Sequence, residues 1–158
     1  MVERGLDRVL DFAMLYHCEN GTARRVGSSV FRTYGRCAYA GNVVAPDTVL
    51  LGMIAECVGR DSLEEIIVAQ NHAVNRVIAP GYDGWLGVDM LAYRRDGEIL
   101  IAPCVEVNLR MTMGVTAMYL QRRLDVSSPR SFSIDFGASS HDGYDILPPR
   151  NDFRFTLK

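Results

Sequence analysis

Three polar side chains alternate with apolar ones in segment 104–110, whose sequence is CVEVNLR. They are Glu106, Asn108 and Arg110, and a β-strand would place them on one face because successive side chains point to opposite sides of a sheet. Carboxylate and amide oxygens are ligands that hard cations such as Mg²⁺ prefer. Arg110 adds a planar, permanently charged group suited to phosphate or carboxylate oxygens. The segment therefore predicts a site for a cation next to an anionic ligand.

A β-hairpin is predicted to bring a second carboxylate to these residues. The dipeptide Asp96-Gly97 separates two runs rich in apolar residues, 85–94 and 99–109. Asn-Gly and Asp-Gly pairs favour two-residue type I′ turns, which fix the register of the two strands. We therefore expect a tight antiparallel hairpin over residues 85–109.

The register of this hairpin predicts where the second carboxylate lies. Counting back from the turn, Asp89 faces Cys104 and is diagonal to Glu106. Diagonal neighbours in an antiparallel pair lie roughly 7–8 Å apart. Asp89, Glu106 and Asn108 can thus converge on one point with only oxygen ligands, the kind that hard cations such as Mg²⁺ prefer.

The alternate positions of the hairpin are apolar and predict its core face. On the second strand they are Ile99, Ile101, Pro103, Val105, Val107 and Leu109, and on the first strand Leu86, Val88, Met90 and Ala92. The polar face has two interpretations. It could be an ordinary solvated face, with Glu106 paired to Arg110. The flanking residues Leu91, Ala102 and Cys104 instead favour partial burial, where an unpaired carboxylate is costly without a cation or a donor.

The remaining elements place this hairpin in an α+β fold. Residues 7–17 and 23–34 flank the turn signal Asn20-Gly21, and the glycine-punctuated segment 35–42 is interpreted as a loop. The other expected elements are a helix from Asp47 to Gly59 with Asp47 as N-cap, a helix from Asp61 or Ser62 to Pro80-Gly81, a helix over 112–124, strands over 130–136 and 152–158, and a long loop between those two strands. We expect a mainly antiparallel sheet with helices packed on one face.

Composition restricts the class of protein. The chain has 158 residues and a net charge of −2, which fits a single domain over 1–158 without the basic stripe of a nucleic-acid-binding protein. It contains no apolar run near the ~20 residues that span a bilayer. Four scattered cysteines predict reduced thiols in a cytoplasmic protein. The three histidines share no metal-binding spacing and are expected to be structural or exposed.

The stretch GVDMLAY…DGEILIAPCVEVNLRMTMG resembles the C-terminal half of an ATP-grasp domain. This family includes ATP-dependent carboxylate–amine ligases such as D-alanine–D-alanine ligase and glutathione synthetase, and also biotin carboxylase. Its pattern is an Asp on one strand and Glu-x-Asn-x-Arg on the next, which Asp89, Glu106, Asn108 and Arg110 meet. The resemblance implies that the first three hold Mg²⁺ against the phosphates of ATP. It implies that Arg110 is catalytic and stabilises the transferred phosphoryl group or an acyl-phosphate.

Weaker likeness extends over the first part of the chain. Segment 2–4 is similar to the hinge strand of ATP-grasp domains, so that Glu3 matches the acid of the nucleotide pocket. In that family, a lobe before the hinge supplies a lysine and a glycine-rich flap, whereas the single lysine here is Lys158. The expected protein is therefore a partial ATP-grasp fold that lacks this lobe.

Two functions follow from the resemblance. The first is the Mg-ATP-binding portion of a ligase that activates a small carboxylate as an acyl-phosphate and passes it to an amine or a thiol. The second is a non-catalytic interaction module or fragment of that fold, which forms a homodimer or pairs with a separate lobe.

Overall fold

The computed structural model describes residues 5–34, 38–136, 144–145 and 153–158. In chain order the elements are β1 (Asp7–Glu19), β2 (Thr22–Tyr34), β3 (Ala38–Val44), α1 (Asp47–Val58), α2 (Arg60–Val77), the 3₁₀ turn η1 (Ala79–Gly81), β4 (Gly84–Arg95), β5 (Glu98–Asn108), α3 (Met113–Arg123), β6 (Arg130–Phe136), β7 (Tyr144–Asp145) and β8 (Phe153–Leu157). No helix within these residues is long and apolar enough to cross a membrane.

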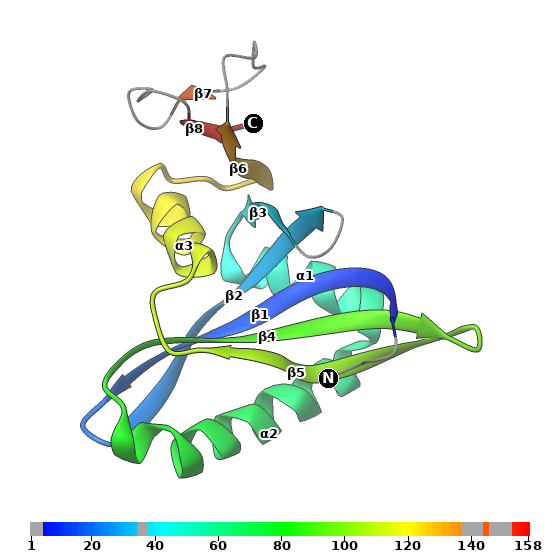
Figure 1. Cartoon of the computed structure of the whole chain (residues 1–158), viewed down its shortest axis with the longest axis vertical. Coiled ribbons are helices and arrows are strands. Elements are labelled where there is room, and N and C mark those ends of the chain that lie inside the picture. The colour runs from blue at the N-terminus through cyan, green and yellow to red at the C-terminus, as the bar shows by residue number, and fades with distance from the viewer. Residues whose placement is uncertain (1–4, 35–37, 137–143, 146–152) are drawn as a thin grey trace.

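The strands form one sheet in the order β5-β4-β1-β2-β3-β6-β8-β7, and each neighbouring pair is antiparallel. The long strands β1, β2, β4 and β5 make up one end of the molecule, and β6, β7 and β8 make up the other (Figure 1). The α+β class with a mainly antiparallel sheet is confirmed.

Helices lie on both faces of the sheet rather than on one. The main core lies between the sheet and helices α1 and α2, where Phe12, Met14 and Tyr16 of β1 are fully buried with Ile54 of α1. Leu15 points to the opposite face, where it packs in a second cluster that includes Val115 of α3. Alternation along β1 thus supplies both faces with apolar side chains.

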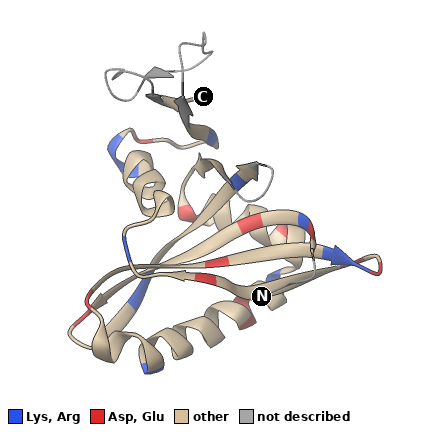
Figure 2. Cartoon of the chain, viewed as in Figure 1, with Lys and Arg blue, Asp and Glu red and all other residues tan. Residues whose placement is uncertain are grey.

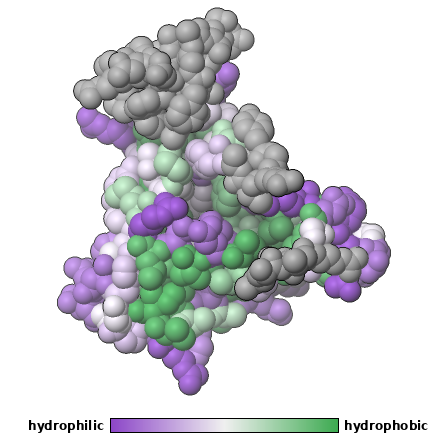
Figure 3. All heavy atoms as spheres, viewed as in Figure 1, coloured by the Kyte–Doolittle hydropathy of each residue, from purple (hydrophilic) through white to green (hydrophobic). Residues whose placement is uncertain are grey.

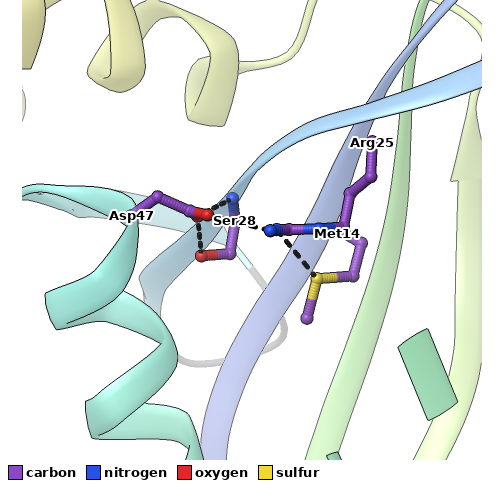
Figure 4. A network of polar contacts seen from close by, with 4 residues as sticks. All are labelled: Met14, Arg25, Ser28 and Asp47. Carbon is purple, nitrogen blue, oxygen red and sulfur yellow. Dashed lines mark hydrogen bonds and ion pairs between the residues drawn. The ribbon is translucent and has the colours of Figure 1, made fainter. Parts of the chain in front are cut away.

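A network of polar contacts connects the start of α1 to β2 (Figure 4). The Asp47 carboxylate accepts hydrogen bonds from the backbone N–H and the hydroxyl of Ser28, both at 2.6 Å, and from Arg25 Nη2 at 3.0 Å. Burial opposes ionisation here, but these hydrogen bonds prevail and hold the pKa of Asp47 below its usual value. Asp47 was expected as the N-cap of this helix. Pro46 takes that position instead, and the Asp47 carboxylate bonds to β2 rather than to the backbone of the helix.

The predicted hairpin is confirmed at its turn. Asp96 and Gly97 have φ angles of 53° and 86°, as a type I′ turn requires, and Arg95 pairs with Glu98. The prediction of a loop over 35–42 is wrong for its second half, because β3 begins at Ala38. The predicted loop between β6 and β8 contains β7, and its other residues lie outside the described part of the chain.

The predicted register is wrong beyond Leu91. Leu91 pairs with Ala102 as expected, but Asp89 pairs with Glu106 instead of Cys104, with an irregularity between Asp89 and Leu91. Pro103 lies at this irregularity and has no N–H to give to the ladder, which explains a bulge at this point.

The apolar face of β5 also departs from the prediction beyond the bulge. Ile99 and Ile101 pack against the main core. Val105, Val107 and Leu109 were expected in the same core, but they are 60%, 41% and 53% exposed. The reason is that β5 is the edge strand, and the helical layer reaches it only as far as Gln70, whose side chain donates to the carbonyl of Pro103 at 2.6 Å.

Candidate functional site

The structure gathers the four residues of the predicted site around one cavity. Asp89, Glu106, Asn108 and Arg110 line a hollow of about 350 Å³ on the sheet face that carries α3. Figure 2 shows acidic positions side by side on β1, β4 and β5, with a basic position on the segment that leads into α3. The sheet thus positions the carboxylates, and the turn after β5 positions the arginine.

Register explains why the carboxylates meet. Ala13 of β1 pairs with Asp89 of β4, which in turn pairs with Glu106 of β5. The bulge at Pro103 converts a diagonal neighbour into a direct one, so the two carboxylates face each other more closely than the sequence predicted. Asn108 is only 6% exposed and donates from Nδ2 to Asp89 Oδ2 at 3.1 Å. This bond leaves the amide oxygen of Asn108 as a potential ligand.

Asp89 is the carboxylate most perturbed by this arrangement. Burial is the main cause that raises its pKa from 3.8 to about 6, and the nearby charge of Glu106 adds to the effect. The hydrogen bond from Asn108 and the charge of Arg110 act in the opposite direction but do not compensate. The donors of the protein therefore do not offset the cost of ionising Asp89 in this partly buried position, and a bound cation would lower that cost.

The donor set suits a hard cation and not a soft one. Among the described residues, no three His, Cys, Asp or Glu side chains group closely enough to form a metal site by themselves. Asp89 and Glu106 with the amide oxygen of Asn108 offer oxygen ligands from two carboxylates and one amide. Magnesium in proteins commonly takes one or two carboxylates and leaves its other positions to water and phosphate. The residues therefore fit Mg²⁺ in the presence of a phosphate ligand.

The N-terminus of α3 forms the wall beside Arg110. Thr112, Met113 and Gly114 line the same cavity as Asp89, Glu106 and Asn108. Thr112 is the N-cap residue of α3, and its buried Oγ1 has no hydrogen-bond partner within the described part of the chain. Helix N-termini favour anions because their first N–H groups are unpaired. This wall, like Arg110, therefore favours a negatively charged ligand group.

Sequence reasoning missed the part of the cavity over β1, β2 and β3. Asp11 accepts hydrogen bonds from Arg8 and from Thr33 Oγ1, the latter at 3.1 Å. Asn42 accepts from the Tyr39 hydroxyl and donates to Ser29 Oγ, both at 2.6 Å. The signal for Asp11 was present, because it is the one charged residue within the run VLDFAMLY. Asn42 and Tyr39 were hidden in a segment interpreted as a loop.

Two other residues singled out in the sequence have different outcomes. Glu3, predicted to contact the nucleotide, lies outside the described residues. Cys104, predicted to face Asp89, is an exposed residue of β5 that does not line the cavity. The binding roles of Asp89, Glu106, Asn108 and Arg110 remain predictions.

The raised pKa of Asp89 predicts an unusual pH dependence of stability. The folded chain holds a proton on Asp89 up to about pH 6, whereas the unfolded chain releases it near pH 3.8. The folded state is therefore favoured at low pH, and this contribution is lost as the pH rises from about 4 through about 6. Asp89→Asn removes the charge, so the ligand-free variant should gain about 1 kcal/mol at pH 7, a figure reduced for the partly exposed position. Urea unfolding of both proteins at pH 4, 5, 6 and 7 measures the difference.

The lowered pKa of Asp47 changes stability with pH in the opposite direction. Both proteins contain Asp47, so its contribution cancels in the difference between them. The expected result is a gap that opens between pH 4 and pH 6. Parallel profiles for the two proteins would show that Asp89 ionises normally in the folded chain.

Comparison with known proteins identifies the fold. The chain is similar to a solved structure from Archaeoglobus fulgidus described as "a putative ATP-grasp superfamily protein", with a TM-score of 0.54 and 13% sequence identity. The match covers 96% of this chain and 46% of that one, so the chain spans about half the length of the structure it matches. No family model matches the sequence, and no curated protein matches it significantly. At this identity the likeness shows an ATP-grasp-like fold.

Proposed function

We propose that this chain is the Mg-ATP-binding portion of an ATP-grasp carboxylate–amine or carboxylate–thiol ligase. The observation that carries the proposal is the convergence of Asp89, Glu106, Asn108 and Arg110 on one cavity, where burial and the charge of Glu106 raise the pKa of Asp89. The ATP-grasp-like fold supports it. A small carboxylate, activated as an acyl-phosphate, is the proposed substrate.

In this proposal each side chain has a separate task. Asp89, Glu106 and the amide oxygen of Asn108 hold Mg²⁺, which when bound would neutralise charge on the phosphates of ATP. Asn108 also orients Asp89 through its amide hydrogen bond. Arg110 contacts the oxygens of the phosphoryl group during transfer, because its fork binds two oxygens at once. Catalysis of phosphoryl transfer consists mostly of such positioning and charge neutralisation.

A thermal melt with Mg²⁺ and a non-hydrolysable ATP analogue tests the proposal. Ligand at 100 times its dissociation constant adds roughly 2.7 kcal/mol of stability, or about 5–10 °C for a chain of this size. We expect this shift with both components and much less with either alone. A protein that melts at the same temperature under all conditions does not bind the nucleotide by itself.

A second candidate function is a non-catalytic interaction module. Figure 3 shows hydrophobic surface over the end of the sheet that carries β5. Val105, Val107, Leu109 and Met111 are exposed on this edge strand and the segment after it. An unpaired, apolar edge strand readily pairs with another chain. The proposed partner is a second copy of this chain or a separate lobe.

Light scattering over a range of protein concentrations distinguishes this candidate. A concentration-dependent dimer that Val107→Lys converts to a monomer would support the interaction module. A monomer at every concentration, together with hydrolysis of ATP, would rule out the homodimeric form.

A further inference from the structure

A second pocket lies on the same face of the sheet, beyond α3. It measures about 490 Å³, and its lining residues are His17, Arg24, Arg25, Val26, Trp85, Tyr119 and Arg122. None of them lines the cavity of the proposed Mg-nucleotide site. The second pocket is therefore distinct from that site.

Strand register builds the floor of this pocket. His17 of β1 pairs with Arg24 of β2 on one side and with Trp85 of β4 on the other. Directly paired residues of neighbouring strands point to the same face, so these three side chains form one row across the sheet. The rings of His17 and Trp85 pack edge to face, with centroids 4.8 Å apart.

Helix α3 supplies the wall of the pocket. The Tyr119 ring packs edge to face against Trp85, with centroids 5.8 Å apart, and Arg122 lies about one turn further along the helix. The helix is held close to the sheet, since a Cβ at Gly114 would lie 2.7 Å from Ser29 Oγ. The wall is therefore fixed relative to the floor.

The charge of the pocket is of one sign. Its charged lining residues are arginines, and no acidic residue within the described part of the chain lines it. Asp47 neutralises Arg25 at 3.0 Å, but neither Arg24 nor Arg122 forms an ion pair with any described residue. This concentration of positive charge occurs in a chain whose net charge is −2. Two unpaired guanidinium groups beside aromatic rings suit phosphate or carboxylate oxygens attached to a ligand of low polarity.

We propose that this pocket is a second binding site, for a ligand that carries phosphate or carboxylate groups. Arg24 and Arg122 hold the anionic groups from the two sides, and His17 adds a ring N–H donor. Trp85 and Tyr119 form the apolar surface for the rest of the ligand. The proposal does not depend on nucleotide binding in the other cavity.

The pocket contains its own reporter, because Trp85 is the only tryptophan of the chain. Its fluorescence is measured during titration with pyrophosphate and, separately, with citrate, at constant ionic strength and without magnesium or nucleotide. We expect a saturable change with at least one anion. The anion that binds more tightly, pyrophosphate or citrate, shows whether the pocket prefers phosphate or carboxylate groups. The absence of a saturable change with both anions would overturn the proposal.

Variants separate this pocket from general charge effects. Arg24→Ala and Arg122→Ala alter exposed side chains and should each weaken binding roughly tenfold or more, as expected for a lost charge-assisted hydrogen bond. The control is Arg95→Ala at the distant hairpin turn, where Arg95 pairs with Asp96 at 3.5 Å. Equal losses in Arg95→Ala would overturn the proposal, because the effect would then be one of net charge. A response lost in Glu106→Gln would overturn it too, by placing the anion in the other cavity.

Discussion

Glu106→Gln is expected to remove most of the stabilisation by Mg²⁺ and the ATP analogue. The substitution keeps the size of the side chain but replaces a charged group, which we propose as a metal ligand, by a neutral one. If binding weakens about 100-fold, ligand that added roughly 2.7 kcal/mol will add only about 0.4 kcal/mol. The melting shift should then fall from about 5–10 °C to about 1–2 °C. Glu106 is exposed, so the ligand-free variant should melt close to the parent.

The matched control is Glu98→Gln. Glu98 is an exposed residue of the same strand, but it pairs with Arg95 at the hairpin turn and does not line the cavity. This variant makes the same change in net charge and should keep the full shift. If both variants lose the shift equally, the loss reflects overall charge. If neither loses it, Glu106 is not a ligand.

The site could be predicted in part because it depends on local rules. A type I′ turn at Asp96-Gly97 fixes the start of the hairpin, and alternation then assigns Glu106 and Asn108 to one face. The exact pairing could not be predicted, because it depends on the bulge. The sequence shows that Pro103 lacks an N–H, but not how the ladder adjusts around it. The prediction therefore named four residues that line one cavity, but it gave the wrong strand partner for Asp89.

The other side of the cavity could not be predicted because its residues come together only in three dimensions. Asp11, Asn42 and Asp89 lie on three different strands, and no local pattern connects them. The glycines of segment 35–42 also favoured a loop, since glycine is common in turns. Gly41 instead lies in β3, where the absence of a side chain permits a close contact between β3 and β6.

Gly41→Ala is expected to have the largest effect on stability. Gly41 has a φ of +143°, which L-residues with side chains rarely adopt. A Cβ at this position would lie 2.3 Å from the carbonyl oxygen of Phe132 in β6, a backbone atom that cannot turn away. Strain and overpacking together should cost about 3 kcal/mol or more, measured by urea unfolding.

Gly52→Ala is the matched control for this substitution. Gly52 lies within α1, and a Cβ there would meet nothing within 4 Å. Alanine is favoured over glycine in a helix by up to about 1 kcal/mol, so this variant should be slightly more stable than the parent. Equal stability of the two variants would show that β3 and β6 do not approach as closely as described.

Hydrogen exchange would show which strands are destabilised in Gly41→Ala. Asn42 pairs with Phe132, so the strain acts where β3 joins β6. Amides of β6 and β8 should lose protection first, because these strands reach the rest of the sheet through β3. Amides of β4 and β1 should stay protected, since they belong to the main core and lie on the far side of β2. Asp89, Glu106 and Asn108, the proposed Mg²⁺ ligands on β4 and β5, would then keep their geometry, and the variant should retain a melting shift that Glu106→Gln loses. Uniform loss of protection over all strands would instead mean that the sheet unfolds as one unit.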